Sequence, residues 1–187
     1  YFLSEECFEK SGERLEELKQ SLEERTGELS DLEVLHLEQS RYYLSRFSVL
    51  NKKRAQSMLV FQEGKGFYNR MTHQRAQSIL EEILGLIECS YFPAQLDFRD
   101  FLLMKNRYSV EGILAGVKDP SNIYLDWYQQ DIMDRILAGK PDLCGITVTN
   151  PPQMIPALTL SRLLKQRGVP VVIGGAYITR LHNQLTP

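Results

Sequence analysis

The stretch Lys140-Pro-Asp-Leu-Cys-Gly-Ile-Thr-Val-Thr-Asn-Pro-Pro-Gln153 decides the fold of the carboxyl-terminal part of the chain. Its apolar run predicts a strand over 143–149, and Pro156 suits the first turn of a helix over about 156–167. Gly168 can end that helix, and a second apolar run predicts a strand over 169–173. Strand, helix and strand in this order indicate a βαβ unit of an α/β protein. Because both strands are continuously apolar, we expect helices to cover both faces of a parallel sheet.

Upstream of this unit the sequence is mainly helical. Apolar spacing predicts helices over 8–25, 30–50 and 72–88. Ser30 or Asp31 can cap the second of these, with Glu33 at the reciprocal position, although Val34–Leu37 could form a short strand instead. A further helix begins at about Ser121 or Asn122 and ends before the Gly139-Lys140-Pro141 stop, whereas 96–117 shows no clear period. We therefore divide the chain into a helical region, 1–118, and a βαβ part, 119–187.

Charge is segregated within the helical region. Residues 1–38 hold 12 acidic and four basic side chains, and residues 41–75 hold eight basic and one acidic. A basic segment could bind phosphates. The stronger interpretation is that helices of opposite sign face each other or solvent. Gly64-Lys65-Gly66 lacks the remaining spacing of a phosphate-binding loop and is interpreted as a turn.

Composition excludes several classes of protein. The net charge of −2 gives no overall attraction to nucleic acid or to an anionic membrane. No window approaches the run of about 20 apolar residues that spans a bilayer. The cysteines and histidines show no disulfide framework and no metal-ligand spacing; they are Cys7, Cys89, Cys144, His36, His73 and His182. We expect a cytoplasmic protein without direct nucleic-acid or membrane partners, and we interpret the chain as a portion of a longer protein.

Each predicted strand runs into an unusual segment. The first ends in Thr147–Gln153, where Pro151 and Pro152 fix the backbone and the hydroxyls and amides are neutral hydrogen-bonding groups. The second ends in Gly174 and Gly175, which carry no side chain and allow a bulky body to approach the backbone. Ligands of open parallel sheets bind beyond the carboxyl ends of the strands. The two ends together predict a site for an uncharged or amide-decorated ligand, although two tight, inert turns explain them equally well.

The stretch 140–153, together with Leu160, Leu163-Leu164-Lys165 and 169–179, resembles the cobalamin-binding domain that precedes the catalytic barrel of radical S-adenosylmethionine enzymes. The resemblance covers about residues 123–181. It implies a Rossmann-like (flavodoxin-like) parallel sheet, incomplete in this chain, with residues 1–118 containing a large helical insertion. It also implies a barrel downstream that carries a [4Fe-4S] cluster and S-adenosylmethionine.

The resemblance implies a role for nine residues. Thr147 and Thr149 correspond to the hydroxyl-bearing strand end near the corrin or its nucleotide tail, and Asn150 and Gln153 would line the lower face of the corrin. The residues that would pack against or beside the dimethylbenzimidazole tail are Gly174, Gly175, Ala176, Tyr177 and Thr179. Tyr177 departs from many relatives, which have histidine there.

The chain lacks the Asp-x-His-x-x-Gly loop that supplies cobalt with a histidine in other cobalamin domains. The resemblance therefore implies base-off cobalamin without a protein ligand, in an enzyme that is most often a methyltransferase. The chain by itself should be inert as an enzyme. Two alternatives remain: a helical interaction or substrate-docking module on a degenerate scaffold that binds no cofactor, and a nucleotide-binding Rossmann domain, which the missing glycine fingerprint disfavours.

Overall fold

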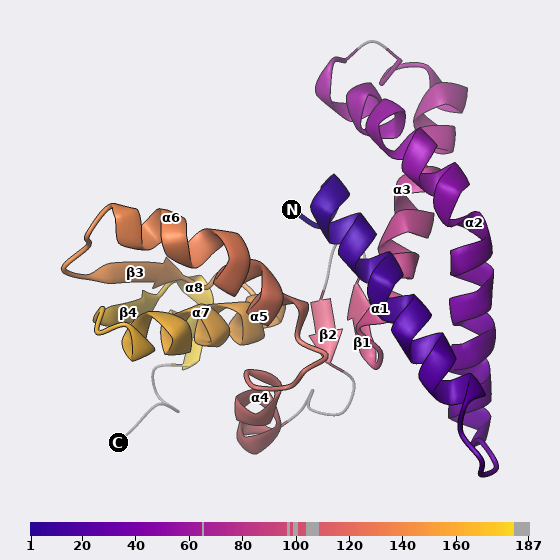
Figure 1. The fold of residues 1–187 in the computed structure, drawn as a ribbon. Helices are drawn as coiled ribbons and strands as arrows, with labels where there is room; N and C mark the ends of the chain where they lie inside the picture. The colour runs from indigo at the N-terminus through magenta and orange to yellow at the C-terminus, as the bar shows by residue number, and fades with distance from the viewer. Residues whose placement is uncertain (65, 97, 99–100, 104–108, 182–187) are drawn as a thin grey trace. The chain divides into compact units, whose positions relative to one another are not determined.

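The structure is a computed structural model that describes residues 1–64, 66–96, 98, 101–103 and 109–181 (Figure 1). The chain forms two compact units, Tyr1–Arg99 and Asp100–Pro187. The sequence placed the division at 118, whereas α4 (Val110–Gly116) belongs to the second unit, where it packs against α7 (Met154–Gln166).

The first unit consists of three packed helices and a short strand. The helices are α1 (Glu5–Glu23), α2 (Asp31–Gln62) and α3 (Arg70–Ser90), followed by β1 (Ala94–Leu96). Their buried faces supply the core of this unit: Phe8, Leu15, Leu50, Ile83, Leu86 and Ile87. Phe8 stacks on Phe47 at 4.5 Å between ring centroids. The three predicted helices are confirmed, with different ends.

Helix α2 is longer than the sequence indicated. Ser30 caps it in the predicted capping box with Glu33, and the alternative strand at Val34–Leu37 is wrong because these residues are helical. The helix continues from Leu50 to Gln62, since Arg54 and Ser57 extend its buried face. The Arg54 guanidinium donates to the Leu3 carbonyl at 2.8 Å. An apolar pattern could not reveal a face that is continued by polar side chains.

Ion pairs account for the charge segregation of the first unit. Arg41 pairs with Glu23 of α1 at 2.9 Å, and Arg54 pairs with Glu5 at 3.3 Å. Each pair joins the basic segment to the acidic one, which confirms that helices of opposite sign face each other. Gly64 and Gly66 both have positive φ, as the predicted turn requires, while Lys65 lies outside the described residues.

The second unit contains the predicted βαβ element. After β2 (Phe101–Leu103) and α4 come α5 (Ile123–Trp127), the π-helical turn η2 (Tyr128–Ile132) and α6 (Met133–Ala138). The remaining elements follow in chain order: β3 (Cys144–Thr147), the 3₁₀ turn η3 (Pro151–Gln153), α7, β4 (Val171–Gly174) and α8 (Ala176–Leu181). The predicted single helix before β3 is therefore interrupted, because the π turn adds a residue to its period.

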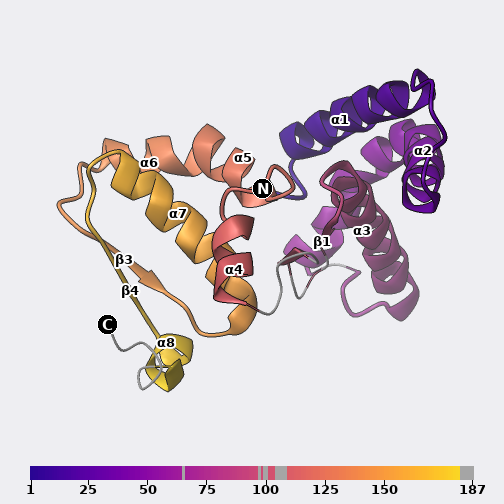
Figure 2. The same cartoon turned by 90° about the horizontal axis from the view of Figure 1, so that it is seen from below.

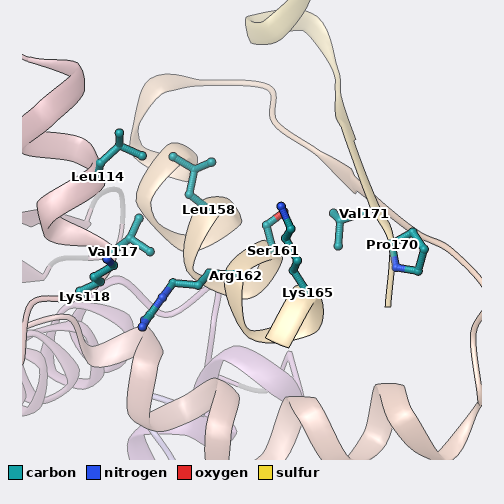
Figure 3. Close-up of a pocket in the computed structure, with 9 residues that line it drawn as sticks. All are labelled: Leu114, Val117, Lys118, Leu158, Ser161, Arg162, Lys165, Pro170 and Val171. Atoms are coloured by element: carbon teal, nitrogen blue, oxygen red, sulfur yellow. The ribbon is translucent and has the colours of Figure 1, made fainter. Parts of the chain in front are cut away.

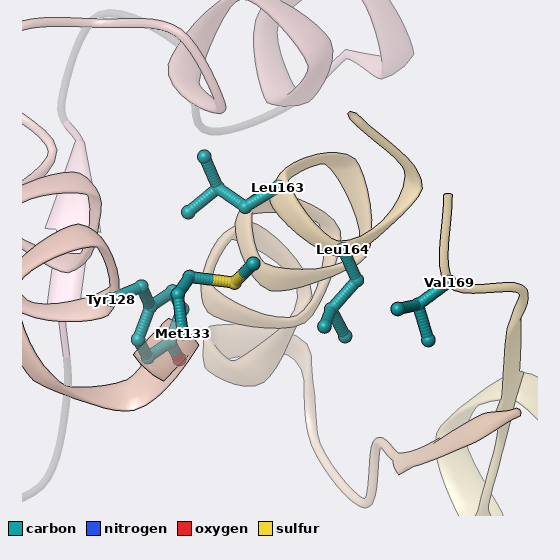
Figure 4. Close-up of a cluster of buried hydrophobic side chains, with 5 residues drawn as sticks. All are labelled: Tyr128, Met133, Leu163, Leu164 and Val169. Atoms are coloured by element: carbon teal, nitrogen blue, oxygen red, sulfur yellow. The ribbon is translucent and has the colours of Figure 1, made fainter. Parts of the chain in front are cut away.

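Strands β3 and β4 are parallel, with Cys144 opposite Val171 and Thr147 opposite Gly174. The α/β assignment of this unit is thus confirmed, as a small two-stranded parallel sheet. A buried cluster lies between the helices and the strands (Figure 4); it consists of Tyr128, Met133, Leu163, Leu164 and Val169. Cys144 and Val171 pack against this cluster from the sheet.

The prediction that helices cover both faces of the sheet is wrong for the described residues. Helices α6 and α7 lie on the same side of the strands (Figure 2). Burial alternates along β3, so that Cys144 and Ile146 are half-buried while Gly145 is exposed, and in β4 Val172 is the exposed residue. Val172 is 57% exposed on the uncovered face. A continuous apolar run could not distinguish one covered face from two.

Candidate functional site

The carboxyl ends of β3 and β4 lie side by side, as the sequence predicted. Thr147 is directly opposite Gly174, and the Val148 N–H donates to the Gly174 carbonyl at 2.7 Å. The Val148 carbonyl then accepts a hydrogen bond from the Tyr177 N–H at 3.2 Å. These two bonds join the end of one strand to the segment after the other, so the two ends form one continuous edge.

The two glycines of this edge differ in what surrounds them. A Cβ atom on Gly175 would lie 2.5 Å from the Val148 carbonyl oxygen and 2.8 Å from the Val148 nitrogen, and the residue has φ +109°. A side chain at Gly175 is therefore excluded by the protein's own backbone. A Cβ on Gly174 would meet no atom within 4 Å. Only Gly174 leaves open space beside the edge.

The proline segment forms a closed turn. Asn150 is extended, and Pro151 begins the 3₁₀ turn η3. The Oε1 atom of Gln153 accepts hydrogen bonds from the Thr149 N–H at 2.7 Å and the Thr149 hydroxyl at 3.0 Å. The loop is therefore braced, as predicted, but the Gln153 oxygen is engaged within it. Among the described residues, the side-chain amide of Asn150 makes no hydrogen bond.

The last three predicted residues lie on helix α8. Ala176 begins the helix and is exposed, and Tyr177 is half-buried. Thr179 donates through both its N–H and its hydroxyl to the Gly175 carbonyl, at 2.9 and 3.0 Å. The structure thus brings all nine predicted residues into the two segments that leave neighbouring strand ends. Their side chains are neutral, so the edge offers hydrogen-bonding groups without a formal charge.

Outside the sheet, the described cysteines and histidines that could take part in chemistry are Cys7, Cys89, His36 and His73, and they are buried or packed against other residues of the chain. Burial raises the pKa of the Cys7 and Cys89 thiols to about 11, which keeps both protonated at neutral pH. A ring nitrogen of His36 forms a hydrogen bond of 2.8 Å with the Cys89 carbonyl, and His73 packs against Phe61 and Phe67. His182 lies outside the described residues. In the described part of the chain, no cluster of three metal-ligating side chains is present.

Sequence reasoning missed a groove between α4 and α7 in the second unit (Figure 3). Its volume is about 530 Å³. The signal that could have revealed it is the spacing of Leu158, Ser161, Arg162 and Lys165, which places these four residues on one face of α7. This face combines apolar and cationic side chains.

The chain therefore consists of a helical unit followed in sequence by an α/β unit, and the α/β unit contains a two-stranded parallel sheet. No family model, curated protein or solved structure matches the chain. Among the described helices, none has both the length and the apolar character that crossing a bilayer requires.

Proposed function

We propose that the edge formed by the ends of β3 and β4 binds cobalamin, and that the chain is the cobalamin-binding portion of a radical S-adenosylmethionine enzyme. The observation that carries the proposal is the juxtaposition of Thr147 with Gly174, which places a proline-braced turn beside an open glycine. The resemblance of residues 123–181 to such domains supplies the identity of the ligand.

The surroundings of the edge fit a bulky neutral ligand at one glycine. Within the described residues, no atom lies within 4 Å of a Cβ placed on Gly174, whereas the space beside Gly175 is taken by Val148. The cobalamin tail would therefore lie against Gly174, and Gly175 would serve to hold the two strand ends together. Thr147, Asn150 and the Gln153 amide group supply neutral donors and acceptors, which suit the amide side chains of a corrin.

In this proposal the chain binds and orients the cofactor, and the cofactor supplies methyl-group or radical chemistry. No side chain of this unit is assigned to cobalt. The iron–sulfur cluster and S-adenosylmethionine would belong to a downstream domain of the same protein, which acts as the partner of this one.

Binding is tested by mixing the purified chain with hydroxocobalamin, removing free ligand by desalting and recording the visible spectrum. We expect retained corrin absorbance with the shape of base-off cobalamin. Gly174→Val should abolish retention because its side chain occupies the tail's space. Gly145→Val is the matched control, since a Cβ on Gly145 also meets no described atom within 4 Å but lies two residues before the end of its strand, whereas Gly174 is the last residue of β4.

Three outcomes decide the proposal. Retention by the wild type and Gly145→Val, with loss in Gly174→Val, supports it. Retention by the wild type and by both variants shows that cobalamin binds somewhere other than the edge beside Gly174. If the wild type retains no corrin, and a longer form of the protein retains none either, cobalamin binding is rejected.

The helical unit supports a second candidate function, an interaction or docking module. Apolar side chains are exposed at the carboxyl end of α2 and just after it, with Phe61 at 37%, Phe67 at 40% and Tyr68 at 92%, and the Phe67 ring contacts the other two. Contiguous exposed apolar surface indicates a contact site. Cross-linking within cell extract distinguishes this function if Phe67→Ser and Tyr68→Ser lose a cross-linked partner that Leu32→Ser, at the opposite end of α2, retains, while corrin retention is unchanged.

A further inference from the structure

The groove between α4 and α7 has an apolar floor. Leu114 and Val117 line it from the α4 side and Leu158 from α7, and Leu114 and Leu158 point into the space between the two helices (Figure 3). Pro170 and Val171 close it at the start of β4. Its volume of about 530 Å³ lies within the range of small-molecule sites.

Three cations surround this floor. They are Lys118, which follows α4, and Arg162 and Lys165, which lie on the same face of α7. No acidic residue lines the groove, and none of the three forms an ion pair with another described side chain. Five arginines elsewhere are paired with carboxylates: Arg25, Arg41, Arg46, Arg54 and Arg135. The groove therefore has positive charge that no carboxylate of the described residues pairs with.

Helix ends explain only part of this arrangement. Cations are favoured near the carboxyl end of a helix, which accounts for Lys165 in the last turn of α7. The helix-end effect does not explain why Arg162, which is half-buried, lines the same groove as Lys118, a residue of another segment. The Ser161 hydroxyl adds a neutral donor to the same wall.

From this combination we infer that the groove binds a small organic anion, a carboxylate joined to an aliphatic body. The carboxylate lies beside Arg162, which extends toward Lys118 (Figure 3), where the planar guanidinium can donate two parallel hydrogen bonds to its two oxygens. The aliphatic body covers Leu114, Val117 and Leu158, which removes apolar surface from water. This inference is independent of the proposed cobalamin function.

The test uses the full chain and decanoate, kept below the concentration at which it forms micelles, in titration calorimetry. We expect decanoate to bind and the neutral analogue decanol to bind at least tenfold more weakly, because it lacks the charge. Raising the salt concentration should weaken decanoate binding. Shifts in amide resonances should map to α4 and α7.

Three substitutions locate the site. Arg162→Gln should raise the dissociation constant about tenfold, as loss of a charge-assisted hydrogen bond predicts. Ser161→Trp should prevent binding by filling the groove. Arg167→Gln is the matched control, because Arg167 lies just beyond α7 and does not line the groove. Far-UV circular dichroism verifies that each variant is folded, because Ser161→Trp adds a second tryptophan to the unit that holds Trp127.

Weaker binding in Arg162→Gln with unchanged binding in Arg167→Gln supports the inference. Equal affinities for decanoate and decanol overturn it, as does an equal loss in the two arginine variants. If an acidic amphipathic peptide binds the groove and decanoate does not, the small-anion inference is wrong and the occupant is a helix.

Discussion

At the scale of single residues, Gly175 is the position of the strand edge where the backbone leaves no room for a side chain. Its φ of +109° lies where amino acids with a side chain are strained, and the Val148 backbone occupies the position of its Cβ. The sequence predicted that both glycines would make room for a ligand. It could not separate them, because adjacent glycines look alike until the backbone angles and neighbours of each are known.

We predict that Gly175→Ala lowers the free energy of unfolding by about 3 kcal/mol, since it adds both backbone strain and overpacking. Gly174→Ala should change it by less than about 0.5 kcal/mol, because its Cβ meets open space. Urea unfolding followed by Trp127 fluorescence measures both. Equal losses in the two variants would contradict the assignment of different roles.

Glu82 on α3 is held by two residues of α2. The Arg46 guanidinium donates to both carboxylate oxygens, and the Tyr42 hydroxyl donates at 3.0 Å. The hydrogen bonds from Arg46 are the main cause that lowers the pKa of Glu82 below its ordinary value of 4.5. A carboxyl group with a lowered pKa stabilises the folded state above that ordinary value, and the contribution is lost as the pH falls through the lower folded pKa.

We therefore predict that Glu82→Gln lowers the free energy of unfolding by about 1 kcal/mol at pH 7 and that its stability depends less on pH below 4.5. Thermal unfolding followed by circular dichroism between pH 7 and pH 3 tests this. Glu81→Gln is the control, because Glu81 is bonded to Gln77 on its own helix. A pH dependence of Glu82→Gln equal to that of the wild type would refute the role of the carboxylate.

At the scale of elements, Asn122 joins three helices of the second unit. Its Oδ1 accepts from the Tyr124 N–H at 3.1 Å and so caps α5. Its amide group donates to the Gly116 carbonyl of α4 at 3.1 Å and to the Thr159 hydroxyl of α7 at 2.9 Å. The sequence predicted the capping role, but the contacts with α4 and α7 depend on tertiary packing.

Asn122→Ala should lower the free energy of unfolding by about 3 kcal/mol, because it removes a helix cap and leaves buried groups without partners. Ser109→Ala, which removes the exposed cap of α4, should cost about 1 kcal/mol. Urea unfolding followed by Trp127 fluorescence compares the two. A loss in Asn122→Ala no larger than that in Ser109→Ala would mean that the tertiary hydrogen bonds contribute little.

The elements also show which parts of the fold the sequence could predict. The βαβ order followed from Gly168 and from two apolar runs, and the parallel register confirmed it. The extension of α2 was missed because Arg54 and Ser57 are polar yet buried. The π turn at Tyr128–Ile132 was missed because the four-residue spacing of Tyr128 and Ile132 also fits an uninterrupted helical period.

At the scale of the whole molecule, the two units differ in how many large apolar side chains they bury completely. Helices α1, α2 and α3 enclose side chains with no exposed surface, including Phe8, Leu15 and Leu50. In the second unit, Leu143 and Val172 are each 57% exposed on or beside the uncovered sheet face. Among the described residues, the large apolar side chains with almost no exposed surface number six in the first unit and three in the second, Ile123, Val148 and Leu164, so the first unit has the larger core.

We predict that residues 1–96 fold in isolation with a cooperative thermal transition, because their core is made within that segment. Residues 109–181 in isolation should melt at a lower temperature, since one face of their sheet has no cover. Circular dichroism of the two fragments measures the transitions. A broad, non-cooperative melt of residues 1–96 would show that its packing depends on the remainder of the chain.

The open space beside Gly174 has a practical consequence for experiments on this chain. Cys7 and Cys89 are buried and Cys144 is half-buried, so the native thiols are poorly placed for fast chemical labelling. Gly174→Cys would put a reactive sulfur on the unobstructed side of the strand edge without disturbing the hydrogen bonds of Val148. A spin label or fluorophore attached there would report directly on whatever molecule approaches that edge.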